Sequence, residues 1–178
     1  MAFENTYDVE SGDDELGTPA LLAGWLAGRD LLDRPDAGRA PDEDDLAAVI
    51  DFREAVRALL LANNGEPLDP RAPETLNRIA ARARLQVGFG GDGRAELAPA
   101  AGGVDSSLAR LLAIISSAMA DGTWSRLKAC RDDDCQWAFY DRSKNRSGTW
   151  CTMAACGNRS KARAYRKRER TARTDDSH

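Results

Sequence analysis

The C-terminal part of the fold is decided by one stretch, CRDDDCQWAFYDRSKNRSGTWCTMAACGNR, which runs from residue 130 to residue 159. It holds all four cysteines of the chain, Cys130, Cys135, Cys151 and Cys156, as two C-x4-C pairs separated by 15 residues. Four thiolates complete the ligand set of a tetrahedral Zn²⁺ and leave no coordination position open for a substrate. The pattern therefore predicts one structural zinc ion and no catalytic metal.

Two other states of these cysteines compete with the metal site: two disulfides, for which four cysteines allow three pairings, and four unrelated buried thiols. The acidic N-terminus, residues 1–14, lacks the pattern of a signal peptide, so we expect a cytoplasmic, reducing location, where disulfides are rare. All four cysteines also fall within 27 positions, and the only histidine, His178, lies far from them in sequence. These observations favour an all-cysteine metal site.

Charge divides the chain in two. Residues 122–178 carry 14 Lys and Arg against 7 Asp and Glu, whereas residues 1–121 carry 11 against 22, so the net charge of −4 conceals a basic and an acidic part. We therefore expect two modules, 1–121 and 122–178, of which the basic one faces a polyanionic partner. The basic module has few aliphatic residues, and so small an apolar content needs a metal or a partner for stability.

The N-terminal module is predicted to be helical with a small β element, which places the chain in the α+β class, mainly α. Thr18 and Pro19 are typical of a helix start, and Gly28 of a helix end. Further helices are expected over 42–63, from Pro73 to about residue 83, and from Asp105 or Ser106 to about residue 121. A glycine-rich turn at 90–93 predicts a hairpin of 85–89 with 95–98.

Other segments of this module have weaker signals. Residues 2–7 are expected to be extended or irregular, and residues 34–40 to form a Pro/Gly turn region. Trp25 and Trp124 are expected in the core, where either could line a ligand pocket. The last helix has an apolar stripe that we expect to be buried, made of Leu108, Leu111, Leu112, Ile115 and Met119.

The segment after Cys156 is rich in arginine. If it continues as a helix, at about 100° per residue, five arginines share a stripe about 80° wide, namely Arg159, Arg163, Arg166, Arg170 and Arg173. Arginine on one helix face suits phosphates and guanine edges, so we expect contact with nucleic acid, with a solvated charge run as the alternative. The predicted contacts are Arg159, Lys161, Arg163, Arg166, Lys167 and Arg170, with a second cluster at Arg142, Lys144 and Arg146.

Signals for catalysis are weak. With a single histidine no nucleophile–histidine pair is expected, no pair of carboxylates stands out, and the glycine-rich run 88–93 lacks the lysine of a phosphate loop. The acidic run 42–45 is explained by a helix N-terminus, and the run 132–134 by added negative charge or outward hydrogen bonds in a zinc loop. No apolar run approaches the length of a membrane span. We predict no enzyme, no catalytic residues and no membrane partner.

Residues 130–146, followed by residues 150–159, resemble the CGNR zinc-finger family of bacterial proteins. Residues 1–121 resemble the ABATE domain that usually precedes this finger, above all in Phe3-Glu4-Asn5-Thr6 and in the helix-turn 18–32. The resemblance implies a stress-induced transcription regulator whose finger binds DNA. Ser147-Gly148-Thr149 departs from the family, which commonly carries more arginine directly before the Trp-Cys step.

The sequence thus predicts a bacterial transcription regulator that binds DNA through a zinc-stabilised basic module. We expect the N-terminal domain to sense a small-molecule effector or to mediate association into a homodimer. The alternative is a zinc-finger adaptor that docks an acidic partner protein without binding DNA. Counterion release on DNA binding, or its absence, separates the two functions.

Overall fold

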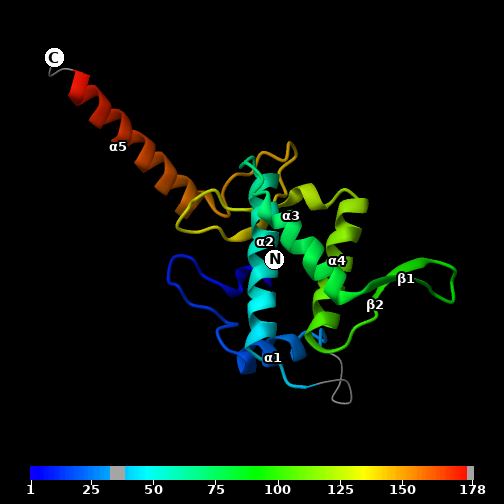
Figure 1. The fold of residues 1–178 in the computed structure, drawn as a ribbon. Coiled ribbons are helices and arrows are strands. Elements are labelled where there is room, and N and C mark those ends of the chain that lie inside the picture. The colour runs from blue at the N-terminus through cyan, green and yellow to red at the C-terminus, as the bar shows by residue number, and fades with distance from the viewer. Residues whose placement is uncertain (33–38, 176–178) are drawn as a thin grey trace.

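The computed structural model describes residues 1–32 and 39–175, with side chains up to Arg166. Helices dominate, and the last of them projects away from the rest of the molecule (Figure 1). The α-helices are α1 (Pro19–Ala27), α2 (Glu43–Asn63), α3 (Arg71–Ala83), α4 (Gly103–Ala120) and α5 (Asn158–Asp175). Shorter helical turns are η1 (Glu4–Thr6), η2 (Trp124–Arg126) and η3 (Met153–Gly157). Together with two small sheets, they confirm the predicted α+β, mainly α class.

Capping residues explain where the first two α-helices start. The Thr18 hydroxyl accepts a hydrogen bond from the Leu21 N–H at 3.2 Å, and Pro19 opens the helix, as predicted. At α2, the Asp42 carboxylate accepts from the Asp45 N–H, and the Asp45 carboxylate accepts from the Asp42 N–H. This reciprocal capping box explains why the acidic run lies at a helix start.

Two helices begin earlier in the chain than the sequence predicted. α3 begins at Arg71, and Pro73 fits inside its first turn because the N–H groups there have no intrahelical acceptor to lose. α4 begins at Gly103, so Asp105 lies within its first turn, where it pairs with Arg82 at 2.6 Å. The side chain of Asp105 therefore links α4 to α3 and does not cap the helix.

Residues 2–7 contain the 3-10 turn η1, and the prediction of an extended or irregular segment there was wrong. The turn forms because the Thr6 hydroxyl donates to the Phe3 carbonyl at 2.7 Å while the Phe3 ring enters the core. That ring lies 5.6 Å from the Trp25 ring and 5.7 Å from the Phe52 ring. The predicted turn region 34–40 lies largely outside the described residues.

The core is built around α2, whose Phe52, Val56 and Leu60 are buried. On α4 the buried residues are confined to positions 104–109, and Met119 is 47% exposed, so its predicted burial was wrong. In the C-terminal half of α4, Leu111, Leu112 and Ile115 are partly buried against the core, and Met119 lies beyond this contact.

The two sheets are antiparallel pairs. β1 (Leu85–Phe89) pairs with β2 (Ala95–Pro99), which confirms the predicted hairpin, and it extends from the body in Figure 1. β3 (Leu127–Ala129) pairs with β4 (Ala138–Tyr140) and packs against α2. Because Ala129 and Ala138 belong to the same hydrophobic cluster as Phe52, the N-terminal and C-terminal parts share one core.

Among the described helices, α4 is long and apolar enough, by length and composition alone, to cross a membrane. Its first turns carry Asp105 and pack into the core beside α2 and α3. A core helix of a folded domain passes the same test, so this match is weak evidence for a membrane span.

Candidate metal centre and basic helix

Four thiols converge between the second sheet and the start of α5. Cys130 directly follows β3, Cys135 lies in the loop before β4, Cys151 precedes η3, and Cys156 lies within η3. Their four Sγ atoms all lie within 4.8 Å of one another. The Sγ atom of Cys151 is 3.6 Å from the Sγ atoms of both Cys135 and Cys156.

These distances suit a bound metal and are too long for disulfides. Zn–S bonds of about 2.3 Å in a tetrahedron place the sulfur atoms about 3.8 Å apart, whereas disulfide sulfurs lie about 2.05 Å apart. All four cysteines are free thiols. The cluster is therefore arranged to bind a metal, and a donor set of four thiolates suits a soft or borderline ion.

Burial makes two of these thiols weak acids on their own. It raises the pKa of Cys151 to about 11 and also raises the pKa of Cys135. Burial opposes ionisation of Cys156 as well, but a hydrogen bond from the Arg159 guanidinium, at 3.5 Å from Sγ, and the neighbouring thiols hold its pKa below the usual value. A cation at the centre would make four thiolates compatible with this burial.

Local hydrogen bonds close the two ligand loops. In the first loop, the N–H groups of Cys135 and Gln136 donate to the Asp132 carbonyl at 2.8 and 3.0 Å. Gln136 adopts a left-handed φ of 49°, which turns the chain into β4. In the second loop, the Thr152 hydroxyl accepts from the Ala155 N–H at 3.3 Å and starts η3. The four-residue spacers thus have room for a complete turn within each loop.

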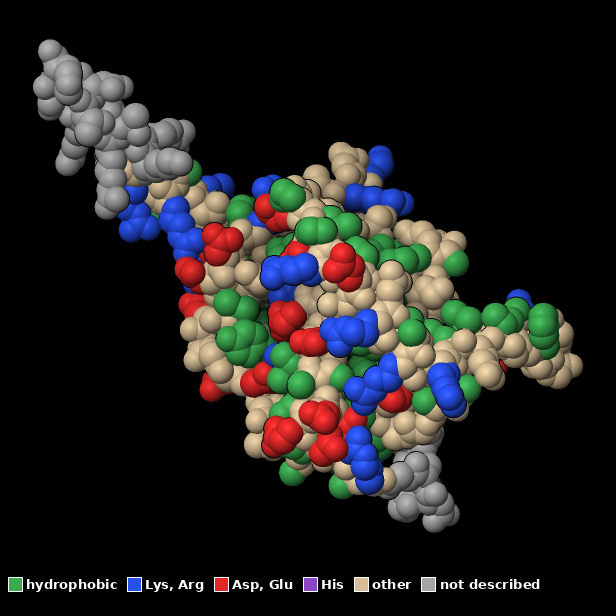
Figure 2. All heavy atoms as spheres, viewed as in Figure 1, with side chains coloured by type: hydrophobic (Ala, Val, Ile, Leu, Met, Phe, Trp, Pro, Cys, Tyr) green, Lys and Arg blue, Asp and Glu red, His purple; other side chains and the backbone are tan. Residues whose placement is uncertain are grey.

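The carboxylate of Asp132 connects the first ligand loop to α5. Its side chain is 1% exposed and lies 2.8 Å from Arg159 Nε and 2.9 Å from Arg163 Nη1. Arg163 also pairs with Asp134, and Arg159 with Glu10 at 2.8 Å. Figure 2 shows basic and acidic side chains side by side at the base of α5. One buried carboxylate therefore joins two successive turns of α5 to the metal loop.

Other predicted nucleic-acid contacts lie farther along α5. Lys161 and Arg166 are exposed side chains, and Arg166 Nε donates to the Ala162 carbonyl of its own helix at 3.3 Å. Lys167 and Arg170 belong to α5, but their side chains lie outside the described part of the chain. The structure thus separates a proximal pair of arginines with acidic partners from basic residues on the projecting part of the helix.

The second predicted basic cluster lies in the loop after β4. Arg142 and Lys144 are exposed, whereas Arg146 donates from Nη1 to the Ser125 hydroxyl at 2.9 Å. Arg142 and Arg159 line the same open cleft beside the cysteines. The structure therefore brings this loop and the base of α5 to one side of the metal centre.

A buried ion pair supports this loop and has no signal in the sequence. Lys128 Nζ lies 2.8 Å from Asp141 Oδ2, and it donates to the carbonyls of Arg146 and Gly148 at 2.6 and 2.9 Å. Burial acts to raise the pKa of Asp141, but the Lys128 ammonium and nearby donors hold it well below its usual range. The pair therefore contributes stability at neutral pH that is lost as the pH falls below the ordinary Asp pKa of about 3.9.

The same pair requires glycine at position 148. A Cβ atom at position 148 would lie 2.8 Å from the Asp141 carboxyl group, closer than real contacts allow. Gly148 also donates its N–H to Asp141 Oδ2 at 2.8 Å. Glycine is thus required here for close approach to a buried carboxylate.

The chain matches the models of two known protein families. Residues 126–169 match the CGNR zinc finger, and residues 1–122 match ABATE, a family described as "Putative stress-induced transcription regulator". The chain belongs to the ABATE family and carries a CGNR zinc finger. This confirms the resemblance inferred from the sequence. No curated protein shows significant similarity to the chain.

Side-chain amides of the ABATE region form hydrogen bonds to the backbone of the segment that carries the CGNR finger. Asn5, in the recognisable N-terminal motif, donates to the Ala138 carbonyl at 3.0 Å and accepts from the Ala138 N–H at 2.7 Å. Asn63, at the end of α2, donates to the carbonyls of Trp124 and Leu127, both at 2.9 Å. These bonds hold the edge of β4 and the entry to β3 on the ABATE helices.

Two further residues, one in α2 and one directly after it, also donate hydrogen bonds to the backbone of the finger. The Asn64 amide donates to the carbonyls of Ala129 and Thr149 at 2.7 and 2.8 Å. The Arg57 guanidinium donates to the Gln136 carbonyl at 2.9 Å, beside the first metal loop. In the sequence, Asn64 indicates only a helix end and Arg57 only a polar position in a helix, so their role in placing the metal loops could not be predicted.

Proposed function

We propose that Zn²⁺ binds the four thiols of the CGNR finger and that α5, held on this metal site, binds duplex DNA in a transcription regulator. The observation that carries the proposal is a basic helix that is anchored at its base and extends away from the body (Figure 1). Anchoring sets the direction of the helix, and projection leaves its distal turns accessible to a long polyanion.

Zinc is the metal that the donor set favours. Four thiolates in a closed tetrahedron, with no oxygen or nitrogen donor, are typical of structural zinc sites. When bound, zinc would link four chain positions that are otherwise joined by few apolar contacts. The chemistry it supplies is a cross-link that positions the base of α5, and this supports a regulator better than an enzyme.

Charge on the projecting part of α5 favours DNA as the partner. From residue 166 to residue 173 the helix has five Lys and Arg, namely Arg166, Lys167, Arg168, Arg170 and Arg173, against Glu169 alone. Like charges three or four residues apart destabilise a helix, and phosphates relieve that repulsion. Because the ABATE region is strongly acidic, we expect DNA to contact α5 and the loop 142–146 and to avoid the rest of the surface.

The proposal divides the basic residues between two roles. Arg159 and Arg163, which are paired with acidic partners, hold the helix in place. Lys161, Arg166 and the more distal basic residues contact phosphates, joined by Arg142 and Lys144 from the neighbouring loop. A bacterial stress response, a cytoplasmic location and a homodimer that presents two such helices belong to the same proposal.

Salt-dependent DNA binding tests this function. We expect the full-length, zinc-loaded chain to bind a fluorescent DNA duplex, measured as a change in fluorescence anisotropy. Its DNA affinity should fall as the salt concentration rises from about 50 to about 200 mM, because binding releases counterions from the phosphates. With about five phosphate contacts, a plot of the logarithm of DNA affinity against the logarithm of salt concentration should have a slope of about −4 to −5. Absence of DNA binding, or a slope near zero, would reject DNA and favour an adaptor that docks an acidic protein surface.

A further inference from the structure

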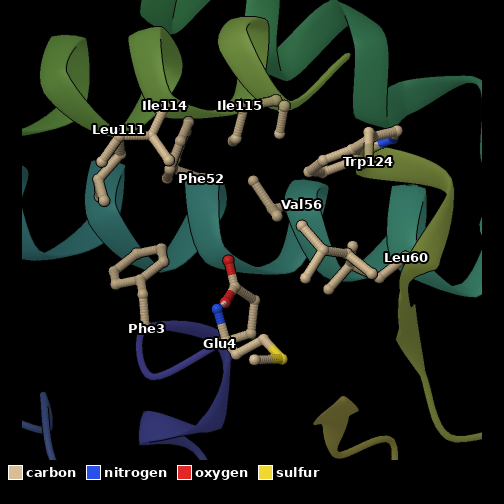
Figure 3. A pocket seen from close by; sticks show the side chains of 12 residues that line it. Phe3, Glu4, Phe52, Val56, Leu60, Leu111, Ile114, Ile115 and Trp124 are labelled. Carbon is tan, nitrogen blue, oxygen red and sulfur yellow. Dashed lines mark ion pairs between the residues drawn. The ribbon is translucent and has the colours of Figure 1, made fainter. Parts of the chain in front are cut away.

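An apolar pocket lies where η1, α2, α4 and η2 meet (Figure 3). Phe52 and Val56 from α2 form one wall, and Ile115 from α4 and the Trp124 ring form others. The cavity measures about 100 Å³, of the same order as the apolar cavity of about 150 Å³ that accommodates benzene. Its mouth is bordered by Ile114, which is exposed. The pocket is therefore large enough for a small ring and is open to solvent.

One ionised group lies in this apolar wall. The Glu4 side chain is 9% exposed, and its carboxylate points into the space between Phe3 and Leu60 in Figure 3. Among the described residues, its ion-pair partner is the α-amino group of Met1, 2.6 Å from Oε2. An ionised carboxylate accepts up to about four hydrogen bonds, so Glu4 has capacity for a further donor that enters the pocket.

These two features are costly in a packed core. Side chains that line a void lose dispersion contacts, and a carboxylate among apolar groups is stabilised only by charged or hydrogen-bonding partners. A ligand with an apolar body and an ammonium group would fill the void and give Glu4 a second donor beside the Met1 α-amino group. An anionic ligand has no such donor to offer the carboxylate.

We propose that this pocket binds a small hydrophobic amine whose ring or branched alkyl group has about six non-hydrogen atoms, the size of benzene, while its amine end lies toward the open mouth. Its apolar part packs among Phe52, Ile115 and Trp124, and its ammonium group donates to Glu4. The inference rests on the proposed function in one respect, because it assigns this amine as the effector of the regulator.

The position of the pocket links it to the finger. Trp124 and Leu127 line the pocket and belong to the segment that leads from α4 into β3. The carbonyls of both residues are held by Asn63. Because β3 ends at Ala129 and Cys130 follows it, a ligand that shifts Trp124 would act on the strand that leads to the first cysteine of the metal centre. We therefore expect occupancy of the pocket to alter how the metal centre and α5 sit on the ABATE region.

The test compares three soluble probes of similar shape on the full-length, zinc-loaded chain: 2-phenylethylamine, 2-phenylethanol and phenylacetate. The readout is the NMR signal of the Trp124 indole N–H, assigned with a Trp124→Phe variant. We expect a saturable shift with the amine, at least tenfold weaker binding of the alcohol, and no binding of phenylacetate. Glu4→Gln should remove the preference for the amine over the alcohol.

A matched pair of variants tests the location. Ala118 lines the pocket and Ala120, on the same helix, is exposed outside it. Ala118→Phe should abolish the shift by filling the cavity, and Ala120→Phe should leave it unchanged. The proposal is overturned if the amine gives no saturable shift, if the alcohol or phenylacetate binds equally well, or if Ala118→Phe binds the amine normally.

The probe series on the unmodified chain decides the question even if Glu4→Gln does not fold. No DNA is present in this titration, so its failure removes the amine site and leaves the DNA-binding proposal untouched. Conversely, a chain that binds the amine and no DNA retains the site and loses its regulatory role.

Discussion

Three consecutive aspartates in the first metal loop have different environments. Asp132 is buried against Arg159 and Arg163, whereas Asp133 and Asp134 are exposed. The identical side chains give no hint of this difference in the sequence, because it depends on where α5 leaves the second metal loop. At the scale of single residues, the direction of α5 depends on one carboxylate.

Replacing that carboxylate should release the helix without removing the metal. In Asp132→Asn the amide has no charge to pair with the guanidinium groups of Arg159 and Arg163, so the base of α5 should be held less firmly. Metal content should stay unchanged, and the distance distribution between spin labels on α5 and α2 should broaden. Asp133→Asn is the matched control. An equally narrow distribution in both variants would contradict the anchoring role of Asp132.

A second residue-scale prediction concerns the buried pair of Lys128 and Asp141. Asp141→Asn leaves the Lys128 ammonium buried without a counter-charge, so the zinc-loaded chain should lose about 3–5 kcal/mol of unfolding free energy in urea at neutral pH. Asp69→Asn breaks the exposed pair with Arg71 and should cause no measurable change. Equal stability of the two variants would show that the buried pair has no structural role.

Individual elements were predictable where their signals are local. The Thr18 cap with Pro19 marks α1, helical periodicity marks α2, and the glycines at 90–93 mark the hairpin. Elements that depend on distant contacts were missed or misjudged. The turn η1 forms because Phe3 enters a core built by other helices, and Met119 is exposed because the contact of α4 with the core ends before it.

The basic helix shows the same limit. Its sequence predicts that Arg159, Arg163 and Arg166 share a face, but helical phase does not say what that face meets. Acidic side chains of the metal loop and the side chain of Glu10 pair with the first two arginines, and no local pattern in α5 predicts these partners. The cluster of four cysteines was predictable because the paired C-x4-C spacing is itself the signal.

Charge reversal on the projecting part of α5 tests its role as the DNA-binding element. Arg166→Glu combined with Arg170→Glu should weaken binding to a DNA duplex and make the log–log salt slope shallower by about 2, one unit for each lost phosphate contact. Arg71→Glu with Arg78→Glu, on α3, makes the same change in net charge. If both double variants weaken binding equally, the effect belongs to overall charge and α5 is not the interface.

At the scale of the whole molecule, the acidic and basic parts of the chain are not separate bodies. They share a core through Ala129 and Ala138, and Asn64 holds strands and loops of the finger on the end of α2. The family matches cover residues 1–122 and 126–169, and the charge difference between the two parts is visible in the sequence. The amide contacts that fasten one to the other are visible only in the structure.

The central claim is that a metal held by four cysteines positions a basic helix for DNA. The most direct test measures metal content and duplex DNA affinity on the same full-length sample, before and after a chelator removes the metal and again after Zn²⁺ is returned. We expect one zinc ion per chain, at least about a tenfold loss of DNA affinity when it is removed, equivalent to 1.4 kcal/mol, and recovery when zinc is returned. Unchanged DNA affinity in the metal-free chain would contradict it.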